Sequence, residues 1–145
     1  MWKIGGAYYV DHVERFRGTP AEVERRMKAR AAKDGKAIVI DLPQHPGQAG
    51  KFQVLYLVGR LAGYSVFHSP ELGSKTQRAD PYAAQQEVGN VYLVGTETTP
   101  WIRAFIEEHA LFPSGDYSDQ VDAAARAFAR CTTGVTRVGR TTGAN

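Results

Sequence analysis

The chain has 145 residues, of which 43% are hydrophobic and 23% charged, as expected for one soluble domain with one core. No apolar run reaches the ~18 residues of a membrane span, and the N-terminal stretch MWKIGGAYYV has no signal-peptide pattern, so we expect a cytoplasmic protein without a membrane partner. The single cysteine, Cys131, excludes an internal disulfide, and the net charge of +3 fits both a polyanion partner and a basic protein with no nucleic-acid role.

The first segment predicts a hairpin, in which WKI, a Gly5-Gly6 turn and AYYVDHVERF form a short and a longer strand. A helix over TPAEVERRMKARAAKDG is expected next. Thr19 is its N-cap, Pro20 its first residue and Glu22 the partner in a capping box, and Gly35 ends it. Its apolar stripe comprises Val23, Met27 and Ala31.

The middle of the chain predicts two further strands. KAIVIDL (36–42) is apolar on both faces, as in a sheet that is covered on both sides. The loop LPQHPGQAGK (42–51) follows, and KFQVLYLVGRLAG (51–63) predicts a helix. YSVFHS (64–69) is the second strand, and ELGSKTQRA (71–79) is expected to be a polar loop.

Three punctuated helices are expected in the last part of the chain. Asp80-Pro81 opens YAAQQEV, and the strand NVYLVG follows. Thr99-Pro100 opens WIRAFIEEHALF, and Ser118 caps DQVDAAARAFAR, after which residues 131–145 predict a flexible polar tail. The helical spacing of Trp101, Phe105, Ile106 and Leu111 predicts that these side chains lie in the core. The alternation of helices and strands indicates one α/β domain with a mixed sheet over residues 1–130.

The loop at 42–51 does not match a nucleotide-binding P-loop, although it follows a strand and precedes a helix. That motif needs a glycine five residues before Gly50, where His45 stands, and a hydroxyl residue after Lys51, where Phe52 stands. Free backbone N–H groups at the start of the following helix still favour an anion such as a nucleic-acid phosphate.

A series of motifs resembles the C-terminal nuclease domain of phage terminase large subunits, which package viral DNA. PQHPGQAGK, LAGY, GSKTQRADPYAAQQEVGNVYLV, FPSG and DQVDAAARAF occur in the same order as in that family, and YYVDHVERFRGTPAEVE also fits. The similarity covers about residues 7–130. It implies an RNase H-like fold, a mixed sheet flanked by helices, that cuts double-stranded DNA in a bacterial host cell, in a protein of phage or prophage origin.

The resemblance also implies a cluster of aspartates that binds two Mg²⁺ or Mn²⁺ ions, which prefer hard oxygen ligands. The sequence departs from this pattern at three places. The first, central strand with its aspartate is absent, and His45 stands at the position of the second aspartate. Only Asp119 remains of the third, paired position, so we assign Asp119 as the metal ligand. Asp41 lies four residues before His45, ~13 Å away on an extended strand, which is too far to replace the missing carboxylate.

The candidate catalytic residues are therefore Asp119, His45 and Asp122, each with a structural alternative. Asp119 begins a helix, where the helix dipole favours any acid. His45 is neutral at pH 7 and a poor ligand for Mg²⁺, so a loop histidine without a catalytic role is the preferred interpretation. Asp122 is expected to be a solvated charge or an ion-pair partner.

Three basic residues, Lys51, Lys75 and Arg78, are candidates to bind DNA phosphates, because loops at the carboxyl ends of strands gather the sites of α/β proteins. The alternative of solvated loop charges is equally supported by the sequence.

The function we expect is metal-dependent hydrolysis of DNA by a terminase nuclease domain that is N-terminally incomplete and catalytically impaired. The alternative is a non-catalytic RNase H-like module that binds DNA or protein. The absent strand leaves open sheet edges that invite pairing with a second copy. Double-stranded DNA, other terminase or portal components and a second copy are thus the expected partners.

Overall fold

The computed structural model of the protein describes residues 1–133, which form five strands and five helices. In chain order these are β1 (Trp2–Ile4), β2 (Ala7–Val10), α1 (Pro20–Asp34), β3 (Val39–Gln44), α2 (Gly47–Arg60), β4 (Ser65–Pro70), α3 (Lys75–Glu87), β5 (Val91–Leu93), α4 (Ile102–Leu111) and α5 (Asp119–Thr132). The expected mixture of helices and strands is confirmed.

The strands form two separate sheets, of which the three-stranded one is mixed, so the expected mixed sheet is present in part. β2 pairs with β1 in the antiparallel and with β5 in the parallel direction, whereas β3 and β4 form a two-stranded parallel sheet. Within residues 1–133 no strand joins the outer edge of β1 to that of β3. These residues therefore do not form one continuous sheet.

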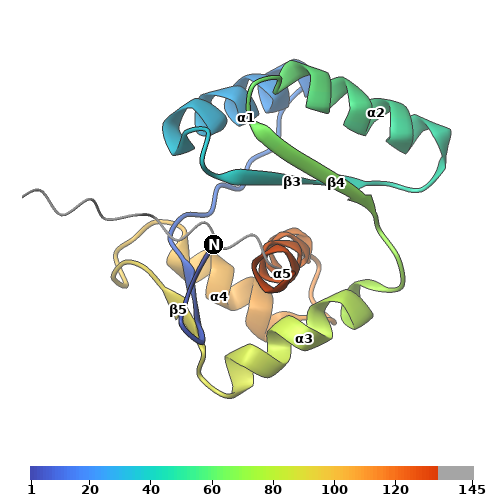
Figure 1. Cartoon of the computed structure of the whole chain (residues 1–145). Helices are drawn as coiled ribbons and strands as arrows, with labels where there is room; N and C mark the ends of the chain where they lie inside the picture. Colours follow the sequence, from blue (N-terminus) through green and yellow to red (C-terminus); the bar gives the residue numbers. More distant parts are fainter. Residues whose placement is uncertain (134–145) are drawn as a thin grey trace, which may run out of the picture.

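Each sheet has a hydrophobic core of its own. The first core contains Tyr8 of β2 together with Tyr82 of α3, Phe105 of α4 and Phe128 of α5. The second core lies between β3, β4, α1 and α2 and is centred on Ala31, Leu42, Val54 and Leu61. Figure 1 shows α1 and α2 on one side of β3 and β4, and α5 on the other side, above α3 and beside α4. Helix α5 is thus the element that lies between the two cores.

The first helix confirms the expected N-cap, proline start and glycine end, but not the capping box, because the Glu22 carboxylate accepts hydrogen bonds from Arg26 instead. The Thr19 hydroxyl accepts a hydrogen bond from the Glu22 backbone N–H, Pro20 is the first helical residue, and Gly35 follows the last. The long strand expected over 7–16 was wrong, because β2 ends at Val10. Its partner β5 has only three residues. After the end of β2, Glu14 lies against α1, where its carboxylate accepts a hydrogen bond from Arg26 at 2.6 Å.

The strand expected over 36–42 lies at Val39–Gln44, and α2 begins at Gly47 rather than at residue 51. The loop around His45 is therefore short, and its second half is the first turn of a helix. Gly50 is needed in this turn, because a Cβ atom there would lie 2.1 Å from the carbonyl oxygen of His45. The glycine thus permits close packing of the helix start on the end of the strand.

The segment 71–79, expected to be a polar loop, contains the start of α3, and Pro81 lies inside this helix rather than at its beginning. The capping signal that decides the start is further upstream. The Ser74 hydroxyl accepts from the Gln77 backbone N–H at 3.1 Å, and the Gln77 side chain accepts from the Ser74 N–H at 2.8 Å. This reciprocal pair stabilises a helix start at Lys75.

Helices α4 and α5 are present near the expected positions, but α4 begins at Ile102 rather than at Thr99-Pro100. Trp101 and Phe105 pack in the first core, but Ile106 and Leu111 are 51% and 62% exposed, so α4 buries a narrower face than the spacing suggested. Helix α5 continues to Thr132, beyond the expected boundary at 130. The remainder of the expected tail, residues 134–145, lies outside the described residues.

Candidate functional site

Parallel pairing of β3 and β4 brings the ends of both strands to one place. Gln44 and Pro70, the last residues of β3 and β4, lie opposite each other in the register, and the Glu71 N–H donates to the Gln44 carbonyl at 3.2 Å. His45 and Glu71 therefore follow the two strands at the same end of the sheet. Helices α3 and α5 pack against each other and begin beside this edge. We call this place the strand-end corner. It consists of His45, Glu71, Lys75, Arg78, Asp119 and Asp122.

A chain of charged contacts crosses the strand-end corner. His45 Nδ1 lies 2.9 Å from Glu71 Oε2, and Glu71 Oε1 lies 3.8 Å from Arg78 Nη2. Arg78 also donates to both carboxylate oxygens of Asp122, at 2.9 and 3.0 Å, and to the Gly73 carbonyl. This bidentate ion pair occupies both oxygens of Asp122 with a cation. The expectation that Asp122 is an ion-pair partner is confirmed.

Asp119 is the most exposed carboxylate of the corner, with 82% of its side chain accessible. Lys75 Nζ lies 3.9 Å from Asp119 Oδ1 and donates to the Ser118 hydroxyl at 2.8 Å. Ser118 precedes α5 but makes no side-chain capping bond to it, contrary to expectation. Each acid of the corner therefore faces at least one basic side chain.

The donor set of the corner does not fit a pair of Mg²⁺ or Mn²⁺ ions. Such ions need several carboxylate oxygens that converge on one point. Within residues 1–133, no three His, Cys, Asp or Glu side chains are grouped so that they could hold a metal ion. Glu71 and Asp122 direct their oxygens to His45 and Arg78 instead.

A buried glutamate fixes the first turn of α5. Glu108 on α4 accepts hydrogen bonds from the Gln120 backbone N–H and from Gln120 Nε2, both at 2.6 Å, and a longer one from the Val121 N–H at 3.4 Å. The side chain of Glu108 is 3% exposed and lies 3.9 Å from Arg15. A carboxylate at this position satisfies free N–H groups of the helix start. Glu108 thereby positions the turn that carries Asp119 and Asp122.

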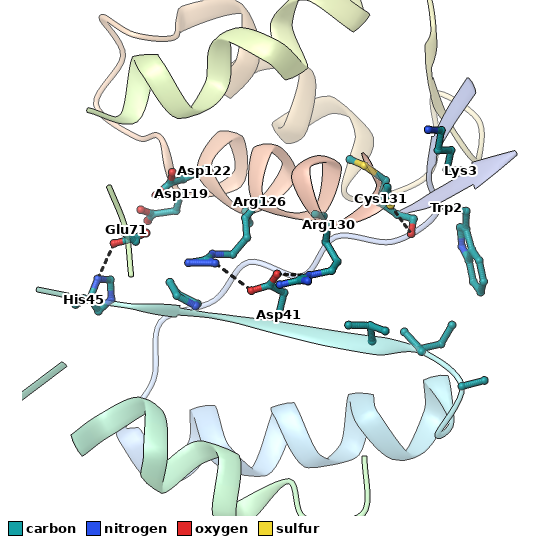
Figure 2. A pocket seen from close by; sticks show the side chains of 17 residues that line it. Trp2, Lys3, Asp41, His45, Glu71, Asp119, Asp122, Arg126, Arg130 and Cys131 are labelled. Atoms are coloured by element: carbon teal, nitrogen blue, oxygen red, sulfur yellow. Dashed lines mark hydrogen bonds and ion pairs between the residues drawn. The ribbon is translucent and has the colours of Figure 1, made fainter. Parts of the chain in front are cut away.

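A groove of about 480 Å³ runs from the strand-end corner along β3 and α5 to the N-terminal strand. Figure 2 shows Asp41 on β3 facing Arg126 and Arg130 on α5, with His45 at one end of the groove and Trp2 at the other. Asp41 Oδ1 accepts from Arg126 at 3.0 Å and Asp41 Oδ2 from Arg130 at 2.7 Å. These ion pairs join the two cores across the groove.

The basic candidates lie in different places. Lys75 and Arg78 are in the strand-end corner, as described. Lys51 is exposed in the first turn of α2 and takes no part in the ion pairs of the corner. The structure thus brings together five of the six candidate residues and leaves Lys51 apart.

The sequence did not identify Glu71, Glu108, Arg126 or Arg130 as parts of this region. A weak signal existed for Arg126 and Arg130, which lie one helical turn apart on the helix that begins with Asp119. The sequence carried no sign that Glu108 would bind the start of the next helix, because this contact depends on how α4 and α5 pack.

Comparisons with protein-family models, curated proteins and solved structures found no match to this chain. Among the described helices, none combines the length and the apolar character that crossing a membrane requires.

Proposed function

We propose that this chain is a diverged nuclease-type domain of a phage DNA-packaging terminase large subunit, with little or no DNA cleavage of its own. The ordered motifs of the sequence suggest the family. One observation carries the proposal: His45, Arg78 and Asp119, which belong to three separate motifs, surround one corner at the ends of parallel strands. Sites of α/β proteins gather at such strand ends.

The loss of cleavage follows from the charges of the corner. A two-metal nuclease holds its ions between carboxylates. The bound ions activate water and stabilise the leaving oxygen. Here the imidazole of His45 stands at one expected carboxylate position, and Arg78 holds the carboxylate of Asp122. The third carboxylate of the corner, Glu71, faces His45 and Arg78. Asp119 is then the exposed carboxylate that remains in the corner, and its two oxygens are too few for two ions.

Cleavage of supercoiled plasmid tests the proposal. The chain is incubated with Mn²⁺ or Mg²⁺, beside Asp119→Ala and a control on α4, Arg103→Gln, whose side chain is 86% exposed. We expect nicking at the level of the protein-free reaction for all three proteins. Robust nicking by the unmodified chain that Asp119→Ala abolishes and Arg103→Gln retains would show an intact nuclease and contradict the claim of impairment.

The second candidate function is binding of double-stranded DNA without cleavage. It is favoured by the position of Lys75, whose side chain is 49% exposed at the corner and whose carboxylate neighbour lies 3.9 Å away. Basic side chains that contact phosphates give an affinity that falls with salt. Residue Lys33, exposed near the C-terminal end of α1, supplies a matched control at the opposite end of β3.

Fluorescence anisotropy with a labelled duplex measures this binding at several salt concentrations. We expect Lys75→Glu to weaken binding and to reduce its salt dependence, and Lys33→Glu to leave both nearly unchanged. Equal effects of the two variants would indicate non-specific attraction by the net charge. No binding at low salt would exclude DNA as the partner of this corner.

A further inference from the structure

Helix α2 has an apolar face that no other element covers within the described part of the chain. Its opposite face is covered, because Val54 is buried in the second core and Leu57 packs against it. Phe52, Leu55 and Tyr56 are instead 72%, 47% and 58% exposed. Figure 1 shows α1 and α2 side by side as the outer layer above β3 and β4. The three exposed side chains therefore face solvent.

The exposed apolar residues of α2 form one stripe. Its members stand at positions i, i+3, i+4 and i+7 of the helix, which share one face: Phe52, Leu55, Tyr56 and Gly59. A Cβ atom at Gly59 would meet no neighbouring atom within 4 Å, so the space beside the stripe is open. We call these four residues the α2 stripe.

The α2 stripe differs from the solvent-facing side of an ordinary surface helix, which is polar. The adjacent helix α1 exposes Arg25 and Lys28 instead. Single apolar residues on a surface need no explanation, but grouped ones mark sites of interaction. Aromatic side chains such as those of Phe52 and Tyr56 are enriched at the centres of protein interfaces. The stripe thus has the composition of a protein-binding surface.

The carboxylate that the α2 stripe contacts belongs to Glu24 on α1, and other groups already hold it. The Tyr56 hydroxyl donates to Glu24 Oε2 at 2.8 Å, and Arg60 donates to Glu24 Oε1. The hydrogen bond from Arg60, followed by that from Tyr56, lowers the pKa of Glu24, and the charge of Lys28 acts in the same direction. This carboxylate therefore offers little free negative charge to a partner.

Two lysines border the α2 stripe, one on each side. Lys51 precedes Leu55 by one turn of α2, and Lys28 follows Glu24 by one turn of α1. Both lysines are exposed, and within residues 1–133 neither forms an ion pair with a carboxylate. Helix α2 itself contains no acidic residue. The borders of the stripe therefore carry positive charge that is available to a partner.

We propose that the α2 stripe binds an amphipathic helix of another protein, which carries acidic side chains along the borders of its apolar face. Phe52 and Tyr56 would anchor the apolar face, as aromatic side chains do where a helix docks on an apolar surface. The acidic side chains would pair with Lys51 and Lys28. This inference does not depend on the proposed terminase function, because it uses neither DNA, a metal nor the strand-end corner.

Charge argues against two segments of this chain as the occupant. If α2 of a second copy lay antiparallel on the stripe, Lys51 of each helix would lie near Arg60 of the other. Like charges disfavour such a pair, and α2 has no acidic side chain that could offset them. Residues 134–145 contain Arg137 and Arg140 and no acidic residue, so the same argument applies to them.

Labelled peptides test the proposal on the full chain by fluorescence anisotropy. The probe ELEALLQELEALLQELE has leucines on one helical face and glutamates along both borders of that face. One control, KLKALLQKLKALLQKLK, reverses the border charges, and the other, ELEAPLQELEAPLQELE, has prolines that prevent a continuous helix. The protein variants are Phe52→Glu, Lys51→Glu and a matched control on α4, Ile106→Glu, at a residue that is 51% exposed. Circular dichroism verifies that each variant is folded.

We expect saturable binding of the glutamate peptide and an affinity at least about tenfold lower for each control peptide. Phe52→Glu should weaken binding of the glutamate peptide by at least about tenfold, and Ile106→Glu should leave it nearly unchanged. Lys51→Glu should weaken binding of the glutamate peptide and strengthen that of the lysine peptide, because it reverses a border charge. No saturable binding, equal binding of the three peptides, or equal effects of Phe52→Glu and Ile106→Glu would overturn the proposal.

Three further outcomes would assign the α2 stripe to another occupant and so contradict the proposal. One is a dimer of the chain that Phe52→Glu dissociates. Another is binding to vesicles of phosphatidylglycerol and phosphatidylcholine that Phe52→Glu abolishes, while the glutamate peptide does not bind. The third is binding of the glutamate peptide only after the chain is shortened to end at Thr133, which would show that its own C-terminal residues cover the stripe.

Discussion

Replacing Glu108 by alanine tests how the start of α5 is held in place. The change removes two hydrogen bonds of 2.6 Å to Gln120, one from its backbone and one from its side chain, and the longer bond from Val121. Hydrogen bonds to a charged group contribute about 1.5–3 kcal/mol each, and buried donors left without a partner add a penalty. Removing the cost of burying the carboxylate offsets part of this loss. We expect a net loss of roughly 3 kcal/mol.

Urea unfolding followed by circular dichroism measures this loss, and a thermal melt should fall by roughly 10 °C for a chain of this size. Glu107 gives a matched control on the same helix, because it is 59% exposed and, within residues 1–133, pairs only with Arg103, four residues earlier. Glu107→Ala should change the free energy of unfolding much less than Glu108→Ala. Equal, small effects of the two substitutions would refute the argument that Glu108 holds the first turn of α5.

Three further substitutions test other buried polar groups. Asp41→Asn leaves Arg126 and Arg130 without their carboxylate and should lower the free energy of unfolding by about 2 kcal/mol in urea titrations. Tyr82→Phe should leave stability unchanged or raise it by up to about 1 kcal/mol, because the buried hydroxyl has no hydrogen-bond partner among the described residues. Burial lowers the pKa of His109, although its hydrogen bond to the Phe105 backbone carbonyl acts in the opposite direction. The free energy of unfolding, measured by urea titration, should therefore fall as the pH drops below about 6.5, the ordinary pKa of histidine.

The sign of the pH effect follows from the proton count. With a depressed pKa in the folded state, the unfolded chain binds the proton of His109 first, so stability is lost on acidification. His109→Gln should flatten this decline between pH 7 and pH 5, and an unchanged slope would contradict the assignment. The control for Asp41→Asn is Asp34→Asn, because Asp34 pairs with Arg30 within one helix. The control for Tyr82→Phe is Tyr56→Phe, because the Tyr56 hydroxyl donates to Glu24. An Asp34→Asn effect as large as that of Asp41→Asn, or a clear loss of stability in Tyr82→Phe, would contradict the corresponding prediction.

Local signals in the sequence were reliable where the decisive contacts were local. Thr19, Pro20 and Gly35 marked the bounds of α1, because a cap and a stop act within one turn. The start of α3 was missed although Ser74 and Gln77 form a local capping box, because Asp80-Pro81 gave a competing signal. Proline removes one backbone donor, and the rest of the capped helix tolerates that loss.

Contacts between distant segments could not be predicted in the same way. The end of β2 at Val10 is set by the length of β5, about eighty residues later, and the division into two sheets is a property of the pairing of all strands. For the site, the resemblance suggested His45 and Asp119, and the position near strand ends suggested Arg78, each one separately. The partner that links two of them, Glu71, became visible only when β3 and β4 were in register.

Binding of Mn²⁺, followed by the loss of the free-ion signal in electron paramagnetic resonance, tests the central claim most directly. That claim is that the carboxylates of the strand-end corner are held by basic partners and do not form a two-metal site. We predict that the chain shows no saturable Mn²⁺ binding and that Asp119→Ala titrates like the unmodified protein. Tight binding of two Mn²⁺ ions per chain, lost in Asp119→Ala, would contradict the account.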